Sequence, residues 1–230
     1  MAIAATIDRA KYDAFRWRYE LSIPRKLVLA FALAGLTGLA AQVKFGLPWT
    51  PVPVTGQTFA VLLSGVMLGR KWGGVGMLMY VGLGTAGMPW FAGWSGGWGT
   101  FTGTTMGYLI GFVLAALFMG YFTDKYVRSR SFFSMLGLML FANFVLIHIP
   151  GLLWLNHYNY EAWLGTSSVL GLGPYTGRGF LSLLMIGTIP FIIGDIVKAA
   201  AAAAIARGGT PKRSYNGEVD KDKWVTWRLP

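Results

Sequence analysis

Cysteine is absent from this chain of 230 residues, and acidic side chains are scarce, with nine Asp and Glu against 20 Lys and Arg. The lack of cysteine excludes a disulfide framework, a thiolate metal site and a cysteine nucleophile. Two histidines without an acidic neighbour in the sequence predict no metal cluster. No G-x-x-x-x-G-K-[ST] motif is present, so the chain has no P-loop of its own for ATP hydrolysis. No serine beside a base is evident either, and we expect no catalytic residues and no cofactor.

Apolar residues make up 54% of the chain, and the mean hydropathy is +0.51, as in a membrane protein. Between Trp72 and Thr123 no residue is charged. That stretch is far longer than the ~20 residues of one span, so it must hold two spans and a break. The formal charge of +11 would suggest nucleic acid in a soluble protein. Here the basic residues cluster before the first apolar run, in short loops and in the tail, which is the positive-inside pattern.

The sequence therefore predicts an all-α integral membrane protein with six transmembrane helices, multi-pass in the cell membrane, with both termini in the cytoplasm. The membrane domain is predicted over residues 27–206, between a basic cytoplasmic segment, 1–26, and a cytoplasmic tail, 207–230. The basic segment could be an interfacial helix on anionic lipid or a solvated tail, and both interpretations stay open. The spans with clear limits are Leu27 to Val43, Gln57 to Leu68, Gly107 to Phe122, Phe132 to Leu155, and Gly179 to Ala206.

The last span carries Asp195 and Lys198, the only two formal charges that we place deep in the bilayer. A charge there costs roughly 2.5 to 3.5 kcal/mol on insertion scales, so it usually marks a ligand or ion site or an internal pair. Three residues apart on a helix, the two side chains lie on neighbouring parts of one face. A solute with N–H donors and an acceptor could bind there. The competing interpretation is a buried pair that only locks helix packing.

Two loops on the outer side have unusual compositions. Gly46 to Thr55 contains three prolines, which exclude a helix and favour a rigid extended loop. Gly87 to Gly103 combines glycine with large aromatic residues, among them Trp90, Phe91, Trp94 and Trp98. These aromatics could form an interfacial belt. Because glycine lets the loop fold back and indoles supply flat apolar walls, we favour an aromatic lid over a ligand.

Two further features lie within spans. Ala30, Ala34 and Gly38 repeat at intervals of four, so one face of the first span is nearly bare and another helix can approach it closely. That helix could belong to this chain or to a separate protein. His148 is the only histidine inside a span, and we expect it to be a hydrogen-bonded packing residue rather than a ligand or proton relay.

Four motifs in order resemble the BioY family, the biotin-specific S components of energy-coupling factor (ECF) vitamin transporters. They are TPVPVTGQT from Thr50, LGTAGMPWFAGWSGG from Leu83, MGYLIGF from Met106 and PFIIGDIVK from Pro190. The resemblance covers Leu27 to Arg207. It departs from the family where GPTGGY becomes GTTMGY, and where His148 replaces an aromatic residue.

The resemblance implies an S-component-like bundle that captures biotin from the outer face, with import powered by a separate transmembrane coupling subunit and two ATPase subunits. Asp195 would accept ureido N–H groups, and Lys198 would donate to the carbonyl or hold Asp195 in its charged state. The resemblance implies further ligand contacts from Tyr108, Trp90, Phe91, Thr105, Gly103 and Pro53. The face of Ala30, Ala34 and Gly38 would match the family's alanine-rich first helix, which docks on the coupling subunit.

Two other functions remain open at this point. The same fold serves several vitamins, so the chain could be an S component for a different one. It could also be a membrane adaptor whose close-packed face is its whole function and which binds no small molecule.

Overall fold

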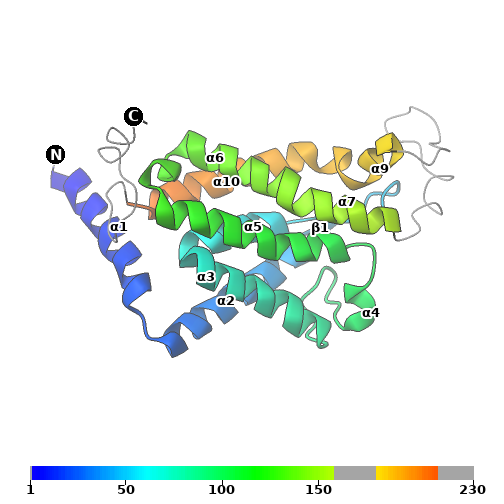
Figure 1. The fold of residues 1–230 in the computed structure, drawn as a ribbon, viewed down its shortest axis with the longest axis horizontal. Helices are drawn as coiled ribbons and strands as arrows, with labels where there is room; N and C mark the ends of the chain where they lie inside the picture. Colours follow the sequence, from blue (N-terminus) through cyan, green and yellow to red (C-terminus); the bar gives the residue numbers. More distant parts are fainter. Residues whose placement is uncertain (1, 158–179, 212–230) are drawn as a thin grey trace, which may run out of the picture.

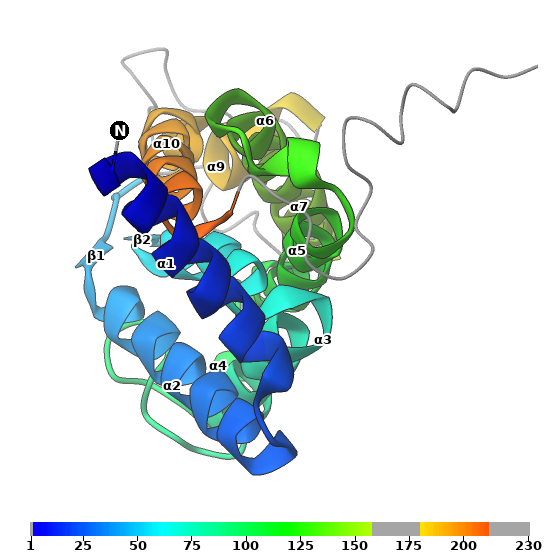
Figure 2. The same ribbon diagram turned by 90° about the vertical axis from the view of Figure 1, so that its left-hand side faces the viewer.

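Apolar helices run along the long axis of the molecule, and one helix, α1, lies across one end of them (Figures 1 and 2). The computed structural model describes residues 2–157 and 180–211. The predicted outer loop between the fifth and sixth spans and most of the predicted tail lie outside these residues. The short helices α4 (Trp98–Phe101) and α9 (Phe180–Gly187) lie at the end opposite α1 (Figure 1). We call this opposite end the site end.

The first helices are α1 (Ala2–Glu20) and α2 (Ile23–Gln42). Pro24 lies in the first turn of α2, where its missing N–H costs no helical hydrogen bond. α1 is docked rather than free, because Phe15 and Arg18 are buried. Arg18 donates to the carbonyls of Val66 and Met67 and pairs with Asp124 at 2.6 Å. The basic segment is therefore a helix fixed to the end of the bundle, and not a solvated tail.

The proline loop follows α2 and is extended, as predicted. Strands β1 (Lys44–Phe45) and β2 (Val54–Thr55) pair antiparallel at its base, with Lys44 opposite Thr55. The hydroxyl of Thr50 donates to the carbonyl of Ile186 at 2.6 Å. This bond ties the loop to α9, so the loop is held at the site end.

Helix α3 (Gln57–Thr85) is a hairpin with Gly69 at its apex. Gly69 has φ +77°, which a residue with a side chain rarely adopts. The two arms pack so closely that a Cβ on Gly73 would lie 2.7 Å from the Cα of Gly65. At the open end, Gln57 donates to the Tyr80 hydroxyl at 2.6 Å. The turn predicted after Leu68 is therefore confirmed.

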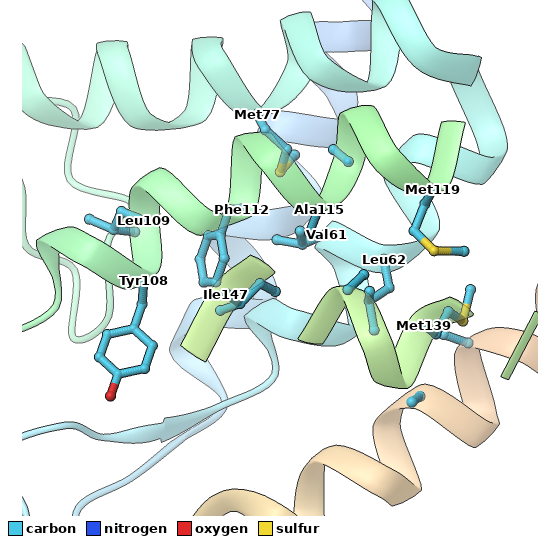
Figure 3. Close-up of a cluster of buried hydrophobic side chains, with 14 of the residues drawn as sticks. Val61, Leu62, Met77, Tyr108, Leu109, Phe112, Ala115, Met119, Met139 and Ile147 are labelled. Atoms are coloured by element: carbon cyan, nitrogen blue, oxygen red, sulfur yellow. The ribbon is translucent and has the colours of Figure 1, made fainter. Parts of the chain in front are cut away.

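Helix α5 (Met106–Lys125) packs against this hairpin and forms the centre of the molecule. A Cβ on Gly65 would lie 2.9 Å from the backbone nitrogen of Gly120, so glycine permits the contact between α3 and α5. The core beside it is apolar and rich in methionine (Figure 3). Its labelled members are Val61, Leu62, Met77, Tyr108, Leu109, Phe112, Ala115, Met119, Met139 and Ile147.

The remaining helices cover the other side of α5 (Figure 2). One run consists of α6 (Phe132–Phe141), the π-helical segment η2 (Ala142–Ile147) and α7 (His148–His157), after the short turn η1 (Val127–Arg130). The second consists of α9, η3 (Ile189–Phe191) and α10 (Ile192–Gly209). Within the alanine run of α10, Ala199, Ala202 and Ala203 are fully buried, which confirms close packing there.

Four helical stretches among the described residues are long and apolar enough to cross a membrane. They are Ile23–Gln42, Met106–Lys125, Phe132–His157 and Phe180–Gly209. The arms of the α3 hairpin are shorter and carry Arg70 and Lys71 at the turn. The described residues thus contain four helical stretches that could span a membrane, while the count of six spans stays a prediction.

The small-residue face of α2 is used inside the molecule. Ala30, Ala34 and Gly38 are buried, and a Cβ on Gly38 would lie 2.8 Å from the Cβ of Trp90. The backbone of Ala30 lies similarly close to Gly76 of α3. The prediction that these three residues dock a partner protein is therefore wrong, because α3 and Trp90 of the same chain already fill that face.

Candidate functional site

A cavity of about 370 Å³ lies at the site end, between the proline loop and the helices. Its walls come from segments far apart in the sequence: the proline loop, the start of α3, the 91–105 loop, α5, and the ends of α7 and α10. The volume lies within the 300 to 1,000 Å³ range typical of small-molecule sites. Asp195 and Lys198 both line it.

Asp195 and Lys198 form an ion pair at the inner wall of this cavity. Lys198 Nζ lies 2.5 Å from Asp195 Oδ1 and donates to the carbonyl of Thr55 at 3.0 Å. The Thr58 hydroxyl lies 3.5 Å from the same carboxylate oxygen. The Asp195 side chain is only 2% exposed, against 19% for Lys198. The prediction that the two residues share one face is confirmed, and the pair borders a cavity.

The second oxygen of Asp195 is held by two more side chains. Asn143 Nδ2 donates to Oδ2 at 2.8 Å, and His148 Nε2 lies 3.0 Å from it. His148 Nδ1 in turn lies 3.1 Å from the hydroxyl of Thr188. A carboxylate oxygen accepts about two hydrogen bonds, so Oδ2 is fully used. A ligand can reach the carboxylate only at Oδ1, where the contact with Thr58 is long and weak.

The π-helical segment η2 explains how Asn143 and His148 reach the same atom. In a regular α-helix, each residue turns about 100°, so side chains five residues apart point about 140° away from each other. A π-helix closes its hydrogen bonds over five residues, which brings such a pair onto the same side. η2 covers residues 142–147 and ends where His148 begins α7. The irregular segment thus positions the carboxylate of Asp195 from the opposite wall.

The apolar wall is built around Tyr108 and Phe91, as predicted. Tyr108 is buried, and its hydroxyl donates to the carbonyl of Gly187 at 2.7 Å. A Cβ on Gly151 would lie 2.5 Å from the Tyr108 ring, so Gly151 makes room for the phenol. Further apolar lining comes from Leu109, Phe112, Ile147 and Phe191. A flat, partly apolar solute would find contact on this side and polar partners on the other.

The remaining predicted residues divide into two groups. Pro53, Gly103 and Thr105 line the cavity together with Tyr108, Phe91, Asp195 and Lys198. Trp90 does not line it, which corrects the prediction for that residue. Its ring packs on Tyr80 at 5.5 Å between centroids, and its indole N–H donates to the Tyr80 carbonyl at 2.8 Å. Trp90 therefore joins the 86–105 loop to α3 instead of facing a solute.

The aromatic lid is also corrected. Trp94 and Trp98 are 63% and 67% exposed, and neither lines the cavity. Of the predicted lid aromatics, Phe91 does line the cavity, and the loop otherwise covers it with small residues such as Ala92, Ser95, Gly99, Thr100 and Gly103. Small side chains leave room for a ligand, while the exposed indoles match the alternative of an interfacial belt.

Sequence reasoning missed two polar residues of the site. His148 is hydrogen-bonded and buried, as predicted, but it also lines the cavity. Asn143 is 1% exposed and was not singled out. A signal was present, since Asn143 is the only strongly polar residue between Ser134 and His148, and buried polar groups in an apolar span need a specific partner.

The site is suited to binding. It offers an acceptor, several donors and an apolar wall, and no group of three or more metal-ligating residues occurs among the described residues. The Asp195 and Lys198 charges compensate each other, so a neutral polar ring can enter without leaving a buried charge unpaired.

Known proteins resemble the chain over most of its length. The model of the BioY family matches residues 15–214. "Probable biotin transporter BioY" of Methanothermobacter thermautotrophicus is 49% identical over 168 residues, which cover 73% of this chain and 100% of that protein. "Probable biotin transporter BioY" of Pyrococcus horikoshii is 34% identical over 182 residues, or 79% of this chain and 94% of that one.

A solved structure has a similar fold. The "Crystal structure at 2.1 A of the S-component for biotin from an ECF-type ABC transporter" superposes with a TM-score of 0.63 and covers 81% of this chain and 93% of the other. The identity is 22%, so this likeness is evidence on the fold alone.

Proposed function

Because the chain belongs to the BioY family of transporters, we propose that it is the biotin-binding subunit of an uptake system in the cytoplasmic membrane. The observation that carries this proposal is the Asp195–Lys198 pair, which lies beside a cavity at one end of the bundle. The proposal gives the chain no catalytic step. Biotin would be held in the cavity and passed inward unchanged.

The chemistry of the inner wall suits the ureido ring of biotin, which has two N–H donors and one carbonyl acceptor. One ureido N–H would bind Asp195 Oδ1 in place of the long Thr58 contact. Lys198 has three N–H donors, and its described partners are Asp195 and the Thr55 carbonyl. The third donor would bind the ureido oxygen. Tyr108 and Phe91 would pack against the thiophane ring and the valeryl chain.

We further propose that the two arms of α3 act as the second and third membrane crossings, which would give six. The arms are joined by the Gly69 turn beside Arg70 and Lys71. Lys125 ends α5, and Arg128 and Arg130 follow it near the same end, since the backbone of Arg70 is hydrogen-bonded to Asp124. By the positive-inside rule this end faces the cytoplasm. Both termini would then be cytoplasmic, and the site end would face outward.

The energy for uptake would come from other proteins, because the sequence contains no P-loop. We propose a transmembrane coupling subunit and ATPase subunits of an ECF module as partners. Since Ala30, Ala34 and Gly38 are buried, the proposed contact with the coupling subunit needs other residues. Those available on α2 include the exposed Phe31, Leu36 and Leu39.

The proposal is tested by purifying the protein from biotin-replete cells and identifying the bound small molecule by mass spectrometry. We expect biotin in near-stoichiometric amount from the wild-type protein and much less from Asp195→Asn. If a different vitamin is bound in the same amount, the proposed substrate is wrong, but the proposal that the chain is a transport subunit stands. The adaptor alternative predicts no bound small molecule, but the cavity beside the charged pair favours a solute-binding protein.

A further inference from the structure

Lys44 is the only formally charged residue in the two described loops of the site end, residues 43–56 and 86–105. It belongs to β1, pairs with Thr55 of β2 and is exposed. Lys198 carries the other positive charge near the cavity, but Asp195 neutralises it at 2.5 Å. Among the described residues at this end, Lys44 therefore supplies the positive charge that an approaching anion meets first.

The side chain of Lys44 reaches across the rim of the cavity. Its Nζ lies 3.0 Å from the position that a Cβ on Gly93 would occupy. Gly93 has φ +79° and follows Ala92, which lines the cavity. The ammonium group thus bridges from the strand pair to the loop that covers the solute site.

A second hollow lies beside the cavity on the same side. It measures about 510 Å³, and Lys44, Leu47 and Thr50 are among its lining residues. Pro51 and Pro53 line both the hollow and the cavity, so the two spaces adjoin at the proline loop. A solute that enters over these prolines passes next to the Lys44 ammonium group.

We propose that Lys44 forms an outer subsite that attracts the carboxylate of the entering solute. This inference rests on the proposed function, because biotin carries a carboxylate on its valeryl chain. Lys44 lies at the rim rather than among the residues of the inner wall. Its effect should therefore fall on the association rate rather than on the dissociation rate.

The test compares association rates of biotin and of biotinamide, in which the carboxylate is replaced by an uncharged amide. Stopped-flow measurements use purified wild-type protein, Lys44→Gln and Lys44→Glu, at low and at high salt. Lys71→Glu is the matched control, since Lys71 is exposed but lies at the opposite end, in the α3 hairpin turn.

For biotin at low salt, Lys44→Gln should lower the association rate about fivefold, the factor that one unit charge at about 4 Å gives in water. Lys44→Glu should lower it further, and 1 M salt should remove most of the difference because charges are then screened within about 3 Å. Biotinamide should bind all variants at one rate, and Lys71→Glu should behave as wild type with both ligands.

Two results would overturn the subsite. One is an unchanged association rate of biotin in Lys44→Glu. The other is an equal loss for biotin and biotinamide, which would mean that the substitution alters the rim itself. In both cases wild-type protein still binds biotin, so the proposed function stands. If wild-type protein binds neither ligand, the proposed function fails and the subsite fails with it.

Discussion

His148 Nε2 lies 3.0 Å from Oδ2 of Asp195, inside a transmembrane bundle and at the wall of a cavity. The imidazole therefore helps to fix the carboxylate that we propose as the biotin acceptor. His148→Phe keeps an aromatic ring but removes this hydrogen bond, and should weaken biotin binding by about tenfold or more, as expected for one hydrogen bond to a charged group. His148→Gln keeps a donor and should retain more of the affinity. Isothermal titration of both variants measures the difference. Binding by the Phe variant as tight as by wild type would mean that the ring only packs.

Substitutions in the Asp195–Lys198 pair should have the largest effect on the affinity for biotin. Asp195→Asn keeps the shape of the side chain but removes the charge that strengthens its hydrogen bonds. Biotin binding should weaken by at least about 30-fold, or roughly 2 kcal/mol, which is typical of a charge-assisted hydrogen bond. Lys198→Met should also bind more weakly. Circular dichroism and size-exclusion chromatography verify that each variant is folded. If the folded variants bind biotin with unchanged affinity, the charged pair only stabilises helix packing and does not bind the ligand.

The docked position of α1 predicts a loss of stability when Arg18 is replaced. Arg18 caps the carbonyl end of the first α3 arm and pairs with Asp124, which itself accepts the backbone N–H of Arg70 at 2.8 Å. Arg18→Met should lower the free energy of unfolding by about 2 to 3 kcal/mol, because buried polar groups lose their partner. The neighbouring Arg16→Gln breaks an exposed pair with Glu20 and, as a surface change, should alter stability by less than about 0.5 kcal/mol. Thermal unfolding of both variants measures the contrast, and equal effects would contradict the docking of α1.

The hairpin turn depends on Gly69. A Cβ there would meet the Asp124 carboxylate at 2.8 Å from Oδ1, in a backbone conformation with φ +77°. Gly69→Ala should therefore cost about 1 to 3 kcal/mol of stability. The matched control is Gly82→Ala in the same helix, where a Cβ meets nothing within 4 Å. That change should be neutral or stabilising, since alanine favours helix by about 1 kcal/mol over glycine. A stable Gly69→Ala protein would show that the turn is not tight at this position.

Tyr19 predicts a pH effect outside the membrane-spanning segments. Burial raises the pKa of Tyr19 to about 12; the charge of Arg18 opposes this rise, while Asp124 reinforces it. The folded state thus favours the protonated phenol. The resulting contribution to stability is fully present below pH 10 and is lost as the pH rises through about 12. NMR of protein labelled at the tyrosine ring carbons, with Tyr19→Phe to assign the signal, measures the titration. Ionisation of Tyr19 near pH 10 would contradict its burial against Asp124.

Local sequence patterns predicted much of this structure. The helix spacing of Asp195 and Lys198 placed them on one face, and the three prolines at positions 48, 51 and 53 predicted the extended loop that reaches the cavity. The shared contact of Asn143 and His148 with Asp195 could not be predicted, because five-residue spacing separates side chains in a regular helix and only η2 brings these two together.

The errors have a common physical origin. Trp90 and the face of Ala30, Ala34 and Gly38 were each assigned to an external partner, the solute or another protein. In the structure the indole of Trp90 packs on Tyr80 and fills the space that Gly38 leaves open. Small and large residues complement each other inside one chain as readily as between chains. The sequence alone does not show whether such residues pack against their own chain or against a partner.

The most direct test of the account is the thermal unfolding of the purified wild-type protein with and without biotin. A ligand at 100 times its dissociation constant stabilises the folded state by about 2.7 kcal/mol, so the melting temperature should rise clearly with biotin and remain unchanged with an unrelated vitamin such as thiamine. Identical melting curves with and without saturating biotin would contradict the claim that the cavity beside Asp195 and Lys198 is a biotin site.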